Sequence, residues 1–141
     1  KKNSKVTFKI GKDAFMAREN TTLLFSDRNN IKTLKVLKGG VLAVFKTGNK
    51  FSLKTKNMTA GIRGTGVYLE NIKDKSYYCT CYGDVNIKSK TQEKNVKADH
   101  HNIVWVSKNG SMTSGKMINH TDKELRELEA LVGRVPAFDK N

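Results

Sequence analysis

The sequence predicts a mostly β fold, with short strands in stacked sheets that form a sandwich or a solenoid-like stack, and one C-terminal α-helix. Short apolar runs alternate with turn residues through about the first 90 residues. The single proline, Pro136, lies outside all of these runs. An amphipathic segment that begins with a capping sequence follows near the C-terminus. With 141 residues the chain is the size of one domain, and we take residues 1–141 as that domain.

The strand prediction rests on alternation and on turn residues. Residues 51–55, FSLKT, alternate with period two, so Phe51 and Leu53 share one face. Residues 41–45, VLAVF, form an unbroken apolar run, which suits a strand covered on both faces. Residues 90–120 are polar, and we expect them to be rich in loops. Strands are expected, in chain order, at residues 6–10, 14–18, 22–25, 31–37, 41–45, 51–55, 66–72, 76–83, 85–89 and 102–107.

The helix prediction covers residues 122–132. Thr121 and Glu124 have the spacing of a capping box. Apolar residues then follow at helical spacing, and Gly133 suits the position just after a helix end. One amphipathic helix must bury its apolar stripe, and we expect it to pack on the β part of its own domain.

The charge of the chain is strongly positive and uneven. The formal net charge is +14, and residues 1–56 carry 14 Lys and Arg against 3 Asp and Glu. Such a Lys-rich half could bind an anionic polymer, but we favour the interpretation that the lysines only keep the surface soluble. No basic cluster interleaved with aromatic residues is present, so nucleic acid is not an expected partner. No apolar stretch approaches the roughly 20 residues of a transmembrane helix.

The two cysteines lie one residue apart in the stretch YYCTCYG, residues 77–83. On a strand, Cys79 and Cys81 point to the same face, with Cα atoms about 6.6 Å apart. Parallel side chains at that separation disfavour a disulfide, which would need a kinked backbone. Two thiolates facing one way could instead share a metal ion. A pair of small buried core residues is the alternative.

Further ligands would have to come from the three histidines, His100, His101 and His120. Thiolate and imidazole ligands suit Zn²⁺ or Cu⁺. We expect His100 and His101 to complete the site, with His120 as a weaker candidate because it directly precedes the helix cap. The spacing matches no standard zinc finger, and the histidines could equally be polar loop residues.

A glycine-rich segment lies between two expected strands and contains Gly61, Arg63, Gly64, Thr65 and Gly66. We expect a structural turn there, because glycine permits positive φ and close backbone approach. Arg63 could hold an anion, but we favour hydrogen bonds to backbone carbonyls. A phosphate-binding loop would precede a helix, whereas a strand is expected here.

The sequence favours a binding module over an enzyme. No serine-hydrolase elbow and no zinc-protease motif is present. A cysteine–histidine nucleophile or a thiol-based redox enzyme stays open as an alternative, since one thiol could meet His100 in space.

Several motifs resemble a known family. Residues 46–70, which end in GIRGTGVYLE, resemble the core of the FecR-type periplasmic domain, named for iron-dicitrate sensor regulators, and residues 64–68 match its glycine–threonine turn. The wider chain is similar to a subset of bacterial proteins in that family, which adds C-T-C-Y-G, an H-H pair and a closing H-T-D-x-E-L-x-x-L-E-x-L-V-G-R-V-P. Residues 79–83, 100–101 and 120–136 match these motifs, so the resemblance covers most of the chain.

This resemblance implies a mostly β module in the periplasm that acts through a protein partner or self-association. The chain opens on Lys1 and Lys2 rather than on Met, so we expect that a preceding segment has been removed. An oxidising compartment would require burial or a metal to protect free thiols. We therefore expect a FecR-like binding or sensory module that ligates Zn²⁺ or Cu⁺. A metal-free scaffold that binds a protein or a polyanion through the Lys-rich N-terminal half is the alternative.

Overall fold

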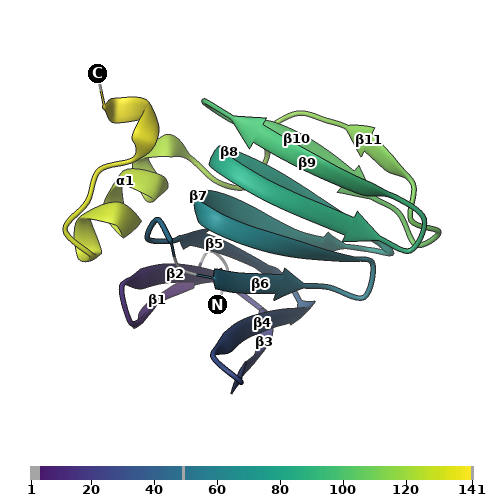
Figure 1. Ribbon diagram of the computed structural model, residues 1–141, viewed down its shortest axis with the longest axis horizontal. Helices are drawn as coiled ribbons and strands as arrows, with labels where there is room; N and C mark the ends of the chain where they lie inside the picture. The colour runs from purple at the N-terminus through teal and green to yellow at the C-terminus, as the bar shows by residue number, and fades with distance from the viewer. Residues whose placement is uncertain (1–3, 49, 141) are drawn as a thin grey trace.

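The computed structural model describes residues 4–48 and 50–140, so Lys1 and Lys2 lie outside the described residues. The predicted class, mostly β with one C-terminal α-helix, is confirmed (Figure 1). The described strands belong to a single 11-stranded sheet that curls on itself, with α1 at one end. The strands are β1 Lys5–Ile10, β2 Asp13–Arg18, β3 Thr22–Arg28, β4 Ile31–Lys38, β5 Gly40–Val44, β6 Lys50–Lys54, β7 Met58–Ile72, β8 Lys75–Ser89, β9 Glu93–Ala98, β10 Asn102–Val106 and β11 Met112–Ser114.

The hairpin of β7 and β8 forms the spine of the sheet. Each of these strands has 15 residues, and they pair antiparallel along nearly their whole length. One path runs β1-β2-β5-β7-β6-β4-β3, and β9 and β10 pair with β8. Only β4 and β6 pair in parallel among the described strands. The two segments predicted at residues 76–83 and 85–89 are therefore one strand.

The glycine-rich segment is not a turn between strands, which corrects that prediction. Gly61 to Gly66 lie inside β7, and the ladder with β8 is irregular between Arg63 and Val67. Gly64 has φ +61°, and a Cβ atom at Gly66 would overlap the Tyr82 ring. Glycine is thus required for a bulge in a long strand rather than for a corner.

The region predicted to be rich in loops contains two further strands, β9 and β11, and a short 3-10 helix, η1 Ala137–Asp139, follows the α-helix. Within β9 only Val96 is buried, because β9 lies beside β8 with its other residues facing solvent or half-exposed. The strand EKNVKA therefore lacks the apolar alternation by which strands are predicted.

Two hydrophobic clusters lie on the two faces of the sheet. One lies inside the curl and includes Phe15, Leu34, Phe51 and Ile87. The other lies beneath the helix, and contains Cys79, Cys81, Tyr68, Leu125 and Leu128, among others. Full burial of a leucine side chain contributes about 1.5–3 kcal/mol, so the second cluster holds the helix against the sheet.

The helix α1 spans Asp122–Leu131, and the predicted helix is confirmed to within one residue. The capping box is present, because the Glu124 amide donates to Thr121 Oγ1 and the Thr121 amide donates to Glu124 Oε1. Val132 is the C-cap, and Gly133 follows with φ +74°. No helix in the described part of the chain is long and apolar enough to span a bilayer.

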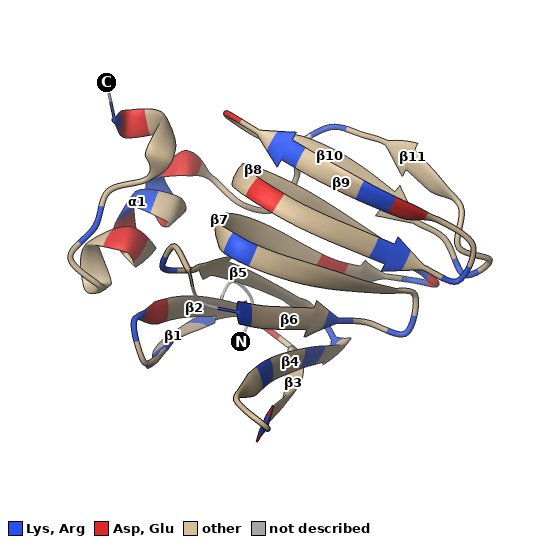
Figure 2. Cartoon of the chain, in the orientation of Figure 1, with Lys and Arg blue, Asp and Glu red and all other residues tan. Residues whose placement is uncertain are grey.

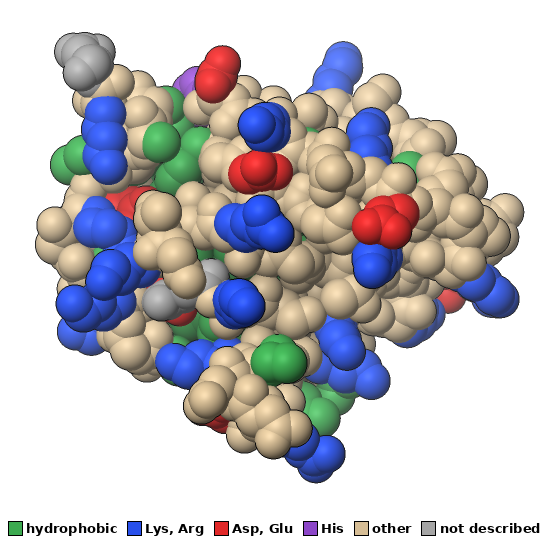
Figure 3. Space-filling view, in the orientation of Figure 1, with side chains coloured by type: hydrophobic (Ala, Val, Ile, Leu, Met, Phe, Trp, Pro, Cys, Tyr) green, Lys and Arg blue, Asp and Glu red, His purple; other side chains and the backbone are tan. Residues whose placement is uncertain are grey.

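Charged side chains are distributed over the outer surface of the sheet. Figure 2 shows Lys and Arg on most strands, with Asp and Glu between them. In the face seen in Figure 3, most basic side chains over the centre and the right stand apart from one another beside uncharged surface, and several lie together at the left edge. Much of the basic charge is thus dispersed over this face.

Candidate metal centre

Cys79 and Cys81 lie on β8 and face the second hydrophobic cluster, as the strand prediction requires. Both are fully buried and neither is in a disulfide. The ladder steps from the pair Gly66–Tyr82 to the pair Val67–Thr80 and leaves Cys81 as an extra residue on β8. This bulge re-aims the Cys81 side chain, and the two sulfur atoms lie 3.5 Å apart.

His101 reaches the sulfurs from the turn between β9 and β10. It has φ +60°, an uncommon conformation for a residue other than glycine. Its backbone amide donates to the Cys81 carbonyl over 2.8 Å, which fixes the turn against the bulge. Its Nδ1 atom lies 3.2 Å from Cys79 Sγ.

His120 approaches from the segment that leads into α1. It is 4 % exposed, and its ring stacks on Tyr68 with centroids 4.7 Å apart. Its Nε2 atom lies 3.4 Å from Cys81 Sγ. The preceding residue, Asn119, has φ +60°, which turns the chain so that the imidazole points inward.

These four side chains form a compact set of potential ligands. One ligand atom from each of Cys79, Cys81, His101 and His120 lies within 4.8 Å of all the others. Two Zn–S bonds of about 2.3 Å at the tetrahedral angle would place the sulfurs about 3.8 Å apart. The observed 3.5 Å separation is close to that value, so a small expansion would admit an ion.

The outer nitrogen of each imidazole has an oxygen partner. His120 Nδ1 lies 2.7 Å from the Ile118 carbonyl oxygen, which can only accept, so Nδ1 carries a proton and Nε2 is the nitrogen turned toward Cys81. His101 Nε2 lies 2.6 Å from Asp122 Oδ1. A carboxylate or carbonyl behind the imidazole is the usual outer shell of a metal-bound histidine.

His100 does not join the four ligand atoms, contrary to its predicted rank above His120. Its Nε2 atom lies 2.8 Å from Asp122 Oδ2, its ring stacks on Phe138, and its side chain is 46 % exposed. The two imidazole rings lie 4.5 Å apart and both contact Asp122, but only His101 also reaches a sulfur. The structure therefore brings His101 and His120 to the two sulfurs, and places His100 against Asp122 and Phe138.

The charges at the site are coupled. The hydrogen bond from the Cys81 thiol lowers the pKa of Cys79, burial opposes this, and the two imidazoles add to the lowering. Burial raises the pKa of Cys81, and the neighbouring Cys79 sulfur raises it further. Burial lowers the pKa of His101, but hydrogen bonds to Cys79 and Asp122 outweigh burial and raise it overall. The Cys79 pKa is thus lowered and the His101 pKa raised in part by their mutual contact.

Asp122 is the site residue that sequence reasoning missed. It occupies the first position of α1, where an acidic residue is ordinary, and so its contact with two histidines had no separate signal. Burial raises its pKa, and hydrogen bonds from His101 and His100 reverse this and lower it overall. Asp122 thereby connects the helix start to the candidate centre.

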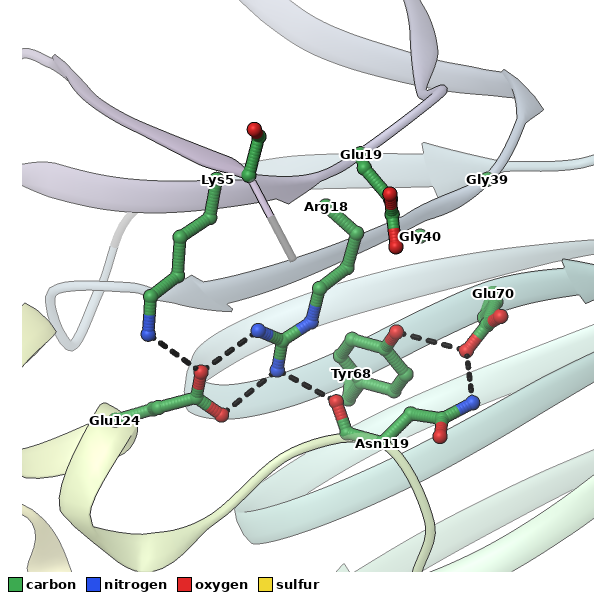
Figure 4. A pocket seen from close by; sticks show the side chains of 10 residues that line it. Lys5, Arg18, Glu19, Gly39, Gly40, Tyr68, Glu70, Asn119 and Glu124 are labelled. Atoms are coloured by element: carbon green, nitrogen blue, oxygen red, sulfur yellow. Dashed lines mark hydrogen bonds and ion pairs between the residues drawn. The ribbon is translucent and has the colours of Figure 1, made fainter. Parts of the chain in front are cut away.

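A polar pocket of about 480 Å³ is lined by Tyr68, Arg18 and Glu124, among others (Figure 4). Arg18 crosses it from β2 and donates to both carboxylate oxygens of Glu124, at 2.7 Å each. Lys5 Nζ adds a 3.0 Å ion pair to Glu124. This network anchors the first turn of α1 to the β1–β2 hairpin at Glu124, four residues beyond His120.

Comparisons with known proteins identify the fold but no family. No family model matches the chain, and no curated protein matches it, so the FecR-type resemblance stays a prediction. Two crystal structures described as a "putative anti-sigma factor" from Parabacteroides distasonis ATCC 8503, at 1.65 Å and 2.50 Å resolution, are similar in structure, with TM-scores of 0.64 and 0.65. Each is 10 % identical in sequence and matches 82 % of this chain, which spans 57 % of the neighbour's length. At this identity the likeness shows a shared fold.

Proposed function

We propose that this chain is a regulatory binding module that holds one soft metal ion, Zn²⁺ or Cu⁺, between Cys79, Cys81, His101 and His120. The observation that carries the proposal is the mutual approach of these four ligand atoms within 4.8 Å. Two sulfur and two imidazole ligands are a common set for structural zinc, and Cu⁺ also favours soft ligands.

The ion would be structural or sensory rather than catalytic. Four protein ligands fill a tetrahedral shell, whereas a catalytic zinc keeps one position for water or substrate. Both sulfurs and His120 are buried, which leaves little room for a substrate at the ion. The ligands come from β8, the β9–β10 turn and the segment before α1, so an ion would join three parts of the chain.

The fold neighbours, each described as a "putative anti-sigma factor", support a regulatory role through protein contact. We infer a protein partner for this chain on the same basis, and a periplasmic location from the FecR-type motifs. In an oxidising compartment a bound ion would keep the two thiols from forming a disulfide.

Elemental analysis of protein prepared without chelators tests the metal proposal. We expect about one Zn or Cu per chain, lost in Cys79→Ser/Cys81→Ser and in His120→Ala. His100→Ala is the matched control, because it removes an imidazole that lies outside the four-atom set, and we expect it to keep the ion. Wild-type protein that never binds either ion, or equal losses in His100→Ala and His120→Ala, would refute the proposal.

A thiol enzyme is the second candidate. The Cys79 thiol contacts His101 Nδ1, and His101 Nε2 contacts Asp122 Oδ1. In such an arrangement the imidazole could act as the base for the thiol, and the carboxylate would orient the imidazole. Full burial of Cys79 counts against substrate access. Rapid alkylation of Cys79 in metal-free protein, abolished in His101→Ala, together with turnover of a thiol or acyl substrate would favour this candidate.

A further inference from the structure

A second candidate site lies on the outer face of β6, β7, β8 and β9, away from the cysteines. The ladders align Ser52 with Gly61, Gly61 with Asn86, and Asn86 with Asn95. This row of small and amide residues crosses four strands, a span of about 14 Å at a strand spacing of about 4.8 Å. The residues are exposed or half-buried, so the row is part of the surface.

A second row, two residues away along each strand, carries charge. The same ladders align Lys50 with Arg63, Arg63 with Asp84, and Asp84 with Lys97. Residues two apart on a strand share a face, so both rows point outward together. Figure 2 shows basic and acidic positions along β6, β7, β8 and β9, and Figure 3 shows basic and acidic side chains on the same face of the molecule.

The surface between these side chains is hollowed at Gly61. A pocket of about 500 Å³ is lined by residues of both rows, including Arg63, Asn86 and Asn95. A Cβ atom at Gly61 would have only the Asn86 carbonyl oxygen nearby, at 3.9 Å, so the missing side chain leaves open space. We call this hollow, with Gly61, Asn86 and Asn95 as its floor, the cross-strand channel, and Ser52 lies beside it as the strand partner of Gly61.

The cations beside the channel are available to a ligand. Lys50, Arg63 and Lys97 are exposed, and none forms an ion pair with another described residue. Asp84 offsets one of the three positive charges, so the row keeps a net charge of about +2. Asn86 donates to Asn95 Oδ1 over 2.7 Å, which orients the amides along the floor. The channel therefore combines fixed cations with amide and hydroxyl groups.

We propose that the cross-strand channel binds an acidic polysaccharide, a hydroxyl-rich chain that carries carboxylate or sulfate groups. The amides and Ser52 can hydrogen-bond sugar hydroxyls, and the guanidinium of Arg63 matches a carboxylate or sulfate in a bidentate contact. Single-stranded nucleic acid would need aromatic side chains on which bases stack. The aromatic residue that lines the channel, Phe51, is 4 % exposed and cannot serve in this way.

This inference is independent of the metal centre and concerns different residues. It also changes the sequence-based expectation of a polyanion site in the N-terminal half, because Arg63 and Lys97 lie beyond that half. The competing explanation is a general attraction of a protein with net charge +14 for any polyanion. The variants must therefore distinguish binding in the cross-strand channel from attraction by the overall charge.

Binding to polygalacturonate, measured by titration calorimetry at moderate salt, tests the proposal. We expect Arg63→Ala to weaken binding about tenfold, the effect of losing one charge-assisted contact. Arg28→Ala, at the far end of β3, removes the same charge and should change affinity less than about twofold. Gly61→Leu should weaken binding at least as much as Arg63→Ala, because it fills the channel and leaves the charge unchanged.

Dextran, an uncharged polysaccharide, and double-stranded DNA serve as comparison ligands. We expect weaker binding of both, and melting curves should show that all variants stay folded. Equal losses in Arg63→Ala and Arg28→Ala, with Gly61→Leu unchanged, would show attraction by overall charge and overturn the proposal. Tighter binding of DNA than of polygalacturonate, or no binding of polygalacturonate, would overturn it as well.

Discussion

Replacement of Glu124 by Gln probes how the helix is attached to the sheet. Glu124 accepts from the Thr121 amide within the capping box and is ion-paired with Arg18 and Lys5. Gln keeps the size and the acceptor oxygen but removes the charge. The variant should therefore fold with its cap intact and lose the ionic part of the attachment.

The magnitude follows from the pKa of Glu124. The hydrogen bonds from Arg18 lower it, burial opposes this, and Lys5 adds to the lowering, so that it falls from 4.5 to about 2. This shift corresponds to about 3 kcal/mol at neutral pH, at about 1.4 kcal/mol per pH unit. Solvent screening of a partly exposed pair reduces it, and we expect Glu124→Gln to cost about 1–2 kcal/mol.

The sign of the pH dependence is fixed by the direction of this shift. Because the folded-state pKa is depressed, the stabilisation is complete above about pH 4.5 and is lost as the pH falls toward 2. Urea unfolding of wild type and Glu124→Gln should therefore give a difference at pH 7 that shrinks by about pH 3. A difference below about 0.5 kcal/mol at pH 7, or one that does not shrink in acid, would refute the reasoning.

Three further predictions concern the centre and the helix. Asp122→Asn should weaken metal affinity about 10–100-fold, because it removes the carboxylate behind His101. Asp139→Asn, which removes a carboxylate paired with Arg126, should leave the affinity unchanged. Competition with a chromophoric chelator measures both affinities. Chelator-treated protein should unfold more easily, and free Zn²⁺ at 100 times its Kd should restore about 2.7 kcal/mol, seen as a shift in thermal midpoint. Leu128→Ala should cost about 2–5 kcal/mol, while Leu131→Ala, at a position 49 % exposed, should cost about 0.5 kcal/mol or less in the same denaturation assay.

Sequence patterns predicted the parts of the fold that local physics determines. Period-two alternation at residues 51–55 corresponds to β6, and the capping box at Thr121 marks the helix start within one residue. The strand β9 escaped prediction because one buried residue, Val96, is too little to produce an alternating pattern. Its formation depends on pairing with β8, a contact between segments that only the folded chain brings together.

The candidate site divides in the same way. The common face of Cys79 and Cys81 follows from strand periodicity, and was predicted. The bulge at Cys81, and the positive φ that turns His101 rather than His100 toward the sulfurs, depend on tertiary contacts. The role of His120 depends on where α1 docks, which sequence spacing does not specify.

Zinc K-edge X-ray absorption of the zinc-loaded protein tests the central claim most directly. Ligation by two cysteines and two histidines predicts two sulfur neighbours at about 2.3 Å and two nitrogen neighbours at about 2.0–2.1 Å from the ion. Loss of one sulfur neighbour in Cys81→Ser should accompany this result. A first shell of oxygen and nitrogen alone, or zinc that washes away before measurement, would contradict the account.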